Sequence, residues 1–496
     1  MQNGKSERKK PELLIPAGSL EVLKTAVLFG ADAVYIGGEE FSLRAKAKNF
    51  GLSEMREGIR FAHEHGVKVY VTANIFAHNG DMEEAGQYFD ELKNLHSGTE
   101  VSSVPDALII SDPGLFSIAK KVWPEVEIHI STQANNTNYE TFLFWHGLGA
   151  KRVVAARELS LEEIGEIRRH IPDDMEIECF IHGSMCISYS GRCLLSNYFT
   201  GRDANQGSCT HPCRWKYAVM EESRPGQYLP IEENERGTFL FNSKDLCMIE
   251  YIPDLVDAGI DSFKIEGRMK TALYVAAVTR TYRRAIDDYF EDENLYQKHL
   301  PWYREEIAKC TYRQFSTGFY FGKPNESNQI YDNSTYVSEY TYLGIVEEGI
   351  CVLSDFTNDF RTGENKAWME KQIEEGHLRW QNLSEVVNAK SDASESTQSS
   401  VGDNESGESQ EQRLVGMLDL RRITQRNKFC LGDTIEIMKP DGRNIPVRVA
   451  GIYDEKFQPM ESAPHAQQKL WLFLLDEENL TDTAASEGDL LRVSAT

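Results

Sequence analysis

Eight short apolar runs, each ending in polar or glycine residues, recur between Leu13 and Gly267, with amphipathic helical patterns between them. Alternating strands and helices are typical of a parallel sheet, and eight such units are the number that closes a (β/α)8 barrel. We therefore predict an α/β fold with a TIM-like barrel. A doubly wound open sheet is the alternative, but no G-x-G-x-x-G follows the first run. The expected strands are Leu13–Gly18, Ala33–Gly37, Lys68–Asn74, Ala107–Asp112, Glu127–Gln133, Arg152–Arg157, Glu176–His182 and Ser262–Gly267.

After Gly322 the pattern changes to short alternating strands, which predict a small β-barrel. We expect a hairpin turn at Pro440–Gly442 and a last edge strand at Gly488–Arg492. The predicted domains are a catalytic barrel at residues 11–325, with a Cys-rich loop at about 183–250, and a β-barrel at residues 326–496. An acidic, disordered insertion at about 358–411 interrupts the second domain, because Ser391–Glu411 holds six acidic and no basic residues.

The net charge and the distribution of apolar residues limit the class of protein to which this chain can belong. A net charge of −25 argues against general binding to nucleic acid or membranes, although a local basic patch can still bind RNA. No apolar segment follows the basic N-terminus, and no run of 18 apolar residues occurs. We therefore predict a cytoplasmic, soluble protein without a membrane partner.

Four of the nine cysteines, Cys186, Cys193, Cys209 and Cys213, lie in one Gly-, Ser- and Arg-rich segment. Buried structural cysteines are usually found among apolar neighbours, so thiolate ligands of a metal centre explain this setting better. The intervals between them are six, fifteen and three residues, which differ from the paired knuckles of zinc sites. An iron–sulfur cluster fits best, with structural zinc or ordinary thiols as alternatives. Cys247 is an alternate ligand.

Residues at the C-terminal ends of barrel strands converge on one mouth, where substrates bind. That rule predicts a substrate pocket beneath the Cys-rich loop. Asp112 is better explained as a helix N-cap, since it precedes Pro113 and Gly114. Lys264 and Glu266 share one strand face, either as functional groups or as a buried ion pair. The pocket candidates are Asn74, Gln133, Arg157, His182, Lys264, Glu266 and Arg268.

The segment Glu178–Ser196, which contains Cys186 and Cys193, resembles the signature of the collagenase-like peptidase family U32. Further motifs extend the likeness over nearly the whole chain apart from the acidic stretch. They are Glu12–Gly18, Gly30–Gly37, Asn242–Cys247, Phe263–Arg268, Arg313–Gly318 and Asn427–Asp433.

The resemblance is strongest to the tRNA branch of this family. It implies an enzyme that supports oxygen-independent hydroxylation of the wobble uridine of tRNA to 5-hydroxyuridine, with prephenate as a required small carboxylate co-substrate. It implies a 4Fe–4S cluster on Cys186, Cys193, Cys209 and Cys213, and a C-terminal domain similar to the β-barrels of translation factors. Association with a second copy or a related family member is also implied.

Other members of the family act on ribosomal RNA or on quinone precursors, and the family name records a peptidase. These activities are the alternatives to tRNA hydroxylation. The sequence offers little for a peptidase, since it contains neither G-x-S-x-G nor H-E-x-x-H. A thiolate that binds iron is also not available to attack a peptide bond.

Overall fold

The computed structural model describes residues 9–39, 41–42, 49–96, 101–186, 188–215, 218–220, 228–230, 244–323, 337–355, 378–382, 412–475 and 485–495. The chain forms two compact units. The first holds residues 1–340 and 440–442, and the second holds residues 341–439 and 443–496. In the described part of the chain, no helix combines the length and apolar character needed to cross a membrane.

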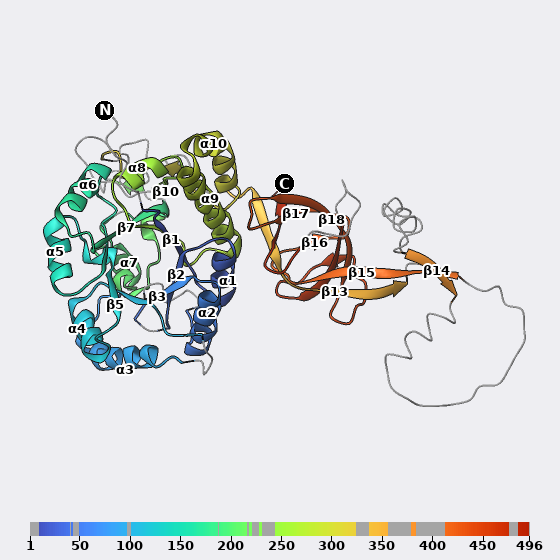
Figure 1. The fold of residues 1–496 in the computed structure, drawn as a ribbon, viewed down its shortest axis with the longest axis horizontal. Helices are drawn as coiled ribbons and strands as arrows, with labels where there is room; N and C mark the ends of the chain where they lie inside the picture. Colours follow the sequence, from blue (N-terminus) through green and yellow to red (C-terminus); the bar gives the residue numbers. More distant parts are fainter. Residues whose placement is uncertain are drawn as a thin grey trace, which may run out of the picture. The chain divides into compact units, whose positions relative to one another are not determined.

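Eight parallel strands form the closed barrel of the first unit (Figure 1). Strand β11 pairs with both β1 and β7, so the sheet has no open edge and the doubly wound alternative is wrong. All eight predicted strands are present. They are β1 (Glu12–Pro16), β2 (Ala33–Gly37), β3 (Lys68–Ala73), β4 (Ala107–Ile110), β5 (Glu127–Ile130), β6 (Arg152–Val154), β7 (Glu176–Gly183) and β11 (Ser262–Ile265).

Helices surround the barrel, and several begin at side chains that cap their first turn (Figure 1). The Asp112 carboxylate accepts a hydrogen bond from the Leu115 N–H at 3.0 Å, which confirms its expected role as an N-cap. Ser160 and Glu163 form a capping box. The helices are α1 (Leu20–Leu28), α2 (Leu52–Glu64), α3 (Met82–Lys93), α4 (Pro113–Val122), α5 (Tyr139–Gly147), α6 (Leu161–His170), α8 (Ile252–Asp257), α9 (Ala272–Glu291) and α10 (Glu293–Ala308).

The long connection between β7 and β11 carries the cysteines. Its described part contains α7 (Leu195–Thr200), β8 (Ala218–Met220), β9 (Tyr228–Pro230) and β10 (Asp245–Cys247). Strand β10 runs antiparallel to the end of β7, and β12 (Phe315–Ser316) pairs with β10. This connection leaves the C-terminal end of β7, so its first residues are held at the mouth of the barrel.

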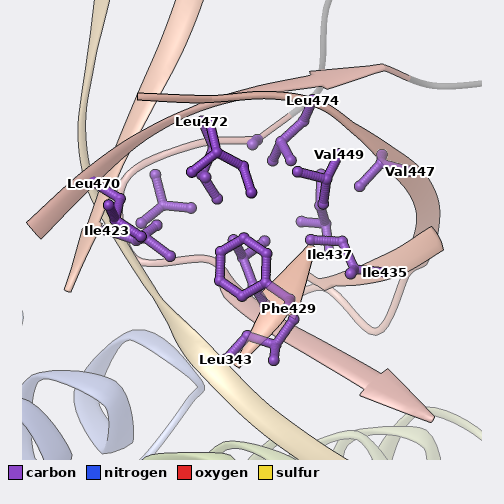
Figure 2. Packing of buried hydrophobic residues seen from close by; sticks show 14 of the residues in the cluster. Leu343, Ile423, Phe429, Ile435, Ile437, Val447, Val449, Leu470, Leu472 and Leu474 are labelled. Carbon is purple, nitrogen blue, oxygen red and sulfur yellow. The ribbon is translucent and has the colours of Figure 1, made fainter. Parts of the chain in front are cut away.

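The second unit is a closed antiparallel barrel of six strands, in the order β13, β21, β17, β18, β20, β15, with β15 paired back to β13. Apolar side chains from these strands fill its interior, among them Ile437, Val449 and Leu472 (Figure 2). The strands are β13 (Tyr340–Asp355), β15 (Gln412–Thr424), β17 (Thr434–Met438), β18 (Asn444–Tyr453), β20 (Lys469–Leu475) and β21 (Leu490–Ser494). The short strands β16 (Phe429–Cys430) and β19 (Ser462–Ala463) pair with each other.

The small barrel agrees with the prediction except in two places. The expected turn at Pro440–Gly442 joins β17 to β18. The expected last edge strand is not an edge, because β21 pairs with β17 and the Val346 N–H donates to the Asp489 carbonyl at 2.9 Å. The range 358–411 was expected to be disordered, but β14 (Leu378–Asn382) lies within it and pairs with β15. Ser391–Glu411 lies outside the described residues.

Candidate active site at the barrel mouth

A cavity of about 450 Å³ opens at the mouth of the first barrel, where strand ends meet the Cys-rich connection. Its size is in the range of small-molecule sites. Six of the seven predicted pocket residues line it together with the four cysteines of the metal-site prediction. These residues are Asn74, Gln133, Arg157, Lys264, Glu266, Arg268, Cys186, Cys193, Cys209 and Cys213. Residues distributed over nearly 200 positions of the sequence thus share one site.

His182, the seventh candidate, lies outside this cavity. Strands β7 and β11 shift register between Lys264 and Ile265, so His182 pairs with Ile265 and not with a residue of the inward face. The ring packs under α9, with Nδ1 3.4 Å from the Tyr282 hydroxyl. Burial lowers the pKa of His182 to about 3. His182 therefore lies between the sheet and α9 and does not line the pocket as predicted. The prediction assumed strict alternation along β7, and the register shift breaks that alternation.

Cys247 pairs with His182 across β10 and β7, and it also lies away from the cavity lining. Its thiol is 3.8 Å from the Tyr282 hydroxyl, and burial raises its pKa to about 11. Cys186, Cys193, Cys209 and Cys213 therefore share the cavity lining, whereas Cys247, which is also half-buried, lies outside it.

The Cys-rich connection is fixed to the barrel mouth by hydrogen bonds. The Asn135 amide donates to the Ser190 carbonyl at 2.9 Å, and Arg192 Nε donates to Asn135 Oδ1 at 2.6 Å. Gly191 adopts a φ of 73°, and a Cβ there would approach the Phe76 ring to 2.9 Å. A side chain at Gly191 would therefore displace the loop from the strand ends.

Hydrogen bonds within the connection bring its two cysteine pairs to the same region. The Ser196 hydroxyl lies 3.0 Å from that of Thr210 and accepts from the Thr210 N–H at 3.1 Å. Asn205 donates to the Cys193 carbonyl at 3.2 Å. The backbone N–H of His211 donates to Cys209 Sγ at 3.4 Å. These bonds join α7, next to Cys193, to the segment that precedes Cys213.

The exposure of the four cavity thiols suits ligation. Cys186 is exposed and Cys193, Cys209 and Cys213 are half-buried, whereas Cys179 and Cys310 are fully enclosed. Burial raises the pKa of Cys310 to about 12, which disfavours its thiolate. In the described ranges, no three His, Cys, Asp or Glu side chains are close enough to hold a single metal ion. Four thiols that line one cavity are a donor set that suits an iron–sulfur cluster.

The inner end of the cavity rests on a buried network of charges. Lys264 Nζ lies 2.6 Å from Glu178 Oε1, and Arg152 Nη1 lies 3.1 Å from Glu178 Oε2. Arg152 also binds Glu12 and Glu176, each at 2.6 Å. The predicted buried pair of Lys264 is therefore formed with Glu178 and not with Glu266. The sequence contained a sign of this network in Glu176-Ile-Glu178, because strand alternation places both carboxylates on the inward face of β7.

Opposing effects set the protonation of this network. Burial alone would raise the pKa of Glu178, but the charges of Lys264 and Arg152 outweigh it and the pKa lies below the ordinary value. Burial lowers the pKa of Lys264, and Glu178 offsets only part of that effect. A barrel interior tolerates these two groups because each has a hydrogen-bonded partner in the other.

Glu12 gives this network a measurable pH dependence. Burial opposes ionisation of Glu12, but Arg152 and the Tyr70 hydroxyl lower its pKa to about 2. A lowered pKa contributes stability above the unfolded-state pKa, and this stability is lost as the pH falls toward 2. Glu12→Gln should remove about 3 kcal/mol of unfolding free energy at pH 6 and much less near pH 2.5. Urea unfolding of the full chain at several pH values measures this, with the exposed Glu166→Gln as control. Equal losses at both pH values would contradict it.

Arg268 and Arg157 enter the cavity from different strands. Arg268 Nη1 donates to the Ser42 hydroxyl at 2.6 Å and to the Thr72 hydroxyl at 3.0 Å. Gly37 makes room for this guanidinium, since a Cβ there would lie 1.9 Å from Nη1. Arg157 Nη1 donates to the Ser184 carbonyl at 2.8 Å. The site therefore combines thiols with guanidinium groups, which bind carboxylate and phosphate oxygens.

Two family descriptions match this chain. The peptidase family U32 matches residues 18–330, and the peptidase family U32 C-terminal domain matches residues 410–492. The first covers seven of the eight barrel strands and the Cys-rich connection, and the second covers most of the small β-barrel.

Curated relatives lie in the same family. The chain is 41% identical over 370 residues to tRNA hydroxylation protein P1 of Bacillus subtilis, covering 74% of this chain and 85% of that protein. It is 34% identical to tRNA hydroxylation protein P of Escherichia coli over 93% of both chains. It is also 38% identical to the 23S rRNA 5-hydroxycytidine C2501 synthase of Escherichia coli, over 57% of this chain and 40% of that protein. These matches show that the chain belongs to peptidase family U32.

Proposed function

We propose that this protein is an iron–sulfur-dependent tRNA hydroxylase, which supports oxygen-independent conversion of the wobble uridine of tRNA to 5-hydroxyuridine. The observation that carries the proposal is that four thiols and several cations line one cavity at a barrel mouth. The tRNA hydroxylation proteins, at 33–41% identity, support tRNA as the substrate. Prephenate is the proposed small carboxylate co-substrate.

Cys186, Cys193, Cys209 and Cys213 would hold a 4Fe–4S cluster in this proposal. When bound, the cluster supplies the electron-transfer chemistry that amino-acid side chains lack. The protein's own contribution is to enclose and orient the reactants. Lys264 and Arg268 are held rigidly by Glu178, Ser42 and Thr72, so their charges are already in place when an anionic group enters.

The surface of the Cys-rich connection suits single-stranded RNA. Residues 183–215 contain three arginines and one acidic residue, in a protein whose net charge is −25. Exposed aromatic rings lie in the same segment, with Tyr198 83% and Trp215 46% exposed. Arginines that contact phosphate and rings that stack on unpaired bases are the usual means of binding such RNA.

Two measurements test the proposal. Protein purified without oxygen should contain about four irons and four acid-labile sulfides per chain, the composition of the proposed cluster. Expression in a bacterium that lacks its own tRNA hydroxylation proteins should restore 5-hydroxyuridine in tRNA, as measured by mass spectrometry of nucleosides. Zinc in place of iron, or hydroxylation found only in ribosomal RNA or a quinone precursor, would contradict the proposal. Cleavage of collagen without any modified nucleoside would favour a peptidase.

A further inference from the structure

Four cationic side chains, those of Arg157, Lys264, Arg268 and Lys270, line the cavity. Among the lining residues that the structure describes, Glu266 alone is a carboxylate, and Glu178 beneath the lining pairs with Lys264, so the cations still outnumber the carboxylates. Three of the cations have their charged ends bound by other groups: Lys264 lies 2.6 Å from Glu178, Arg268 donates to Ser42 and Thr72, and Lys270 donates to the Thr311 carbonyl at 3.3 Å. The fourth cation is Arg157.

Arg157 presents one edge of its guanidinium without a protein partner in the described structure. Its Nη1 donates to the Ser184 carbonyl, and its plane stacks on the Phe180 ring at 3.9 Å, which fixes its orientation. Its Nε is buried and has no hydrogen-bond partner among the described residues. Nε and Nη2 form the edge that matches both oxygens of a carboxylate. A buried donor without a partner is costly, so this edge suits a bound oxyanion.

Gln133 carries a second polar atom without a partner in the same cavity. The residue is 7% exposed, and its Oε1 is buried with no donor among the described residues. The segments after β5 and β6, which carry Gln133 and Arg157, are joined where the Ala156 N–H donates to the Asn136 carbonyl at 3.0 Å. A ligand that satisfies both atoms must offer an oxyanion to Arg157 and a hydrogen-bond donor to Gln133.

We infer that Arg157 and Gln133 form a subsite for a small hydroxycarboxylate. The carboxylate binds the Nε–Nη2 edge of Arg157, and the hydroxyl donates to Gln133 Oε1. An ammonium donor is disfavoured because Lys264, Arg268 and Lys270 would repel it. A small molecule is favoured over the RNA backbone because Arg157 and Gln133 both belong to the cavity lining, and Gln133 is almost fully enclosed there. The inference rests on the proposed function in that it gives the carboxylate co-substrate its binding residues.

Titration calorimetry with the full chain tests the subsite, using prephenate and citrate as probes. Arg157→Lys keeps the charge and removes the two-donor edge, so affinity for the acids should fall about ten- to hundredfold. Gln133→Leu should weaken binding about tenfold, because the ligand hydroxyl loses its acceptor. Arg169→Lys, the same change at an exposed position of α6, is the control and should bind like the wild type. Iron content and thermal unfolding are measured for each variant.

Binding of either acid that depends on both Arg157 and Gln133 supports the subsite. Equal affinity in the wild type and both variants would overturn it, and so would the absence of binding of both acids to the wild type. An Arg157→Lys variant that binds the acids normally but loses affinity for tRNA would show that this edge contacts phosphate. Arg157-dependent acid binding without any 5-hydroxyuridine in tRNA would leave the subsite in place and contradict only the proposed reaction.

Discussion

Replacing Cys193 by Ala is expected to reduce the iron and sulfide content to background and to abolish formation of 5-hydroxyuridine. A cluster held by four thiolates loses one ligand, and the redox chemistry is lost with the cluster. The barrel should remain folded, because Cys193 is half-buried and sits on the connection and not in a strand. Iron and sulfide analysis, nucleoside mass spectrometry and circular dichroism measure the three effects.

The matched control for this substitution is Cys430→Ala, which removes a half-buried thiol from β16 in the second unit. It should retain full cluster content and activity. A Cys193→Ala variant that still contains four irons would show that this thiol is not a ligand. Loss of iron from Cys247→Ala but not from Cys193→Ala would instead assign the fourth ligand to Cys247.

Glu178→Leu should be the most destabilising substitution in the barrel core. It leaves Lys264 and Arg152 in the interior without their shared carboxylate, and breaking one side of a buried ion pair typically costs about 3–5 kcal/mol. Glu178 is completely buried, so solvent screens little of this effect. Urea or thermal unfolding of the full chain measures the loss.

A second variant separates lost charge pairing from lost packing. Glu178→Leu combined with Lys264→Met removes both charges of the pair and should recover part of the stability, because one unpaired charge is gone. The double variant should be more stable than Glu178→Leu alone. A double variant that loses the sum of the two single losses would show that the pair contributes no coupling.

The barrel was predictable because parallel strands covered by helices are buried on both faces and therefore appear as separate apolar runs. The cavity was predictable because such strands end at one mouth, and this rule placed Asn74, Gln133 and Arg157 together. His182 was misplaced because a local register shift reverses the direction of its side chain. The partner of Lys264 was missed because pairing between β7 and β11 joins residues 86 positions apart, which local periodicity does not reveal.

The sequence also predicted the second unit only in part. Its apolar strands were visible in the alternation, but the pairing of β21 inside the ring depends on closure between distant strands. Strand β14 lies in a polar region whose composition favoured disorder. Its pairing with β15 is a tertiary interaction, and composition does not report such interactions.

Strand β11 follows β7 after the 78 residues that separate Gly183 from Ser262, and the barrel closes when β11 also pairs with β1. The entropy of joining two chain ends grows only with the logarithm of the distance along the chain, so doubling an ordinary connection costs about 0.6 kcal/mol. Insertions and deletions in this connection are therefore inexpensive for the folded state. Their main effect falls on the folding rate, because the ring is complete only after its most distant pair of strands has met. Proteins built on this barrel can thus acquire new substrate-binding loops at one position while the eight strands stay unchanged.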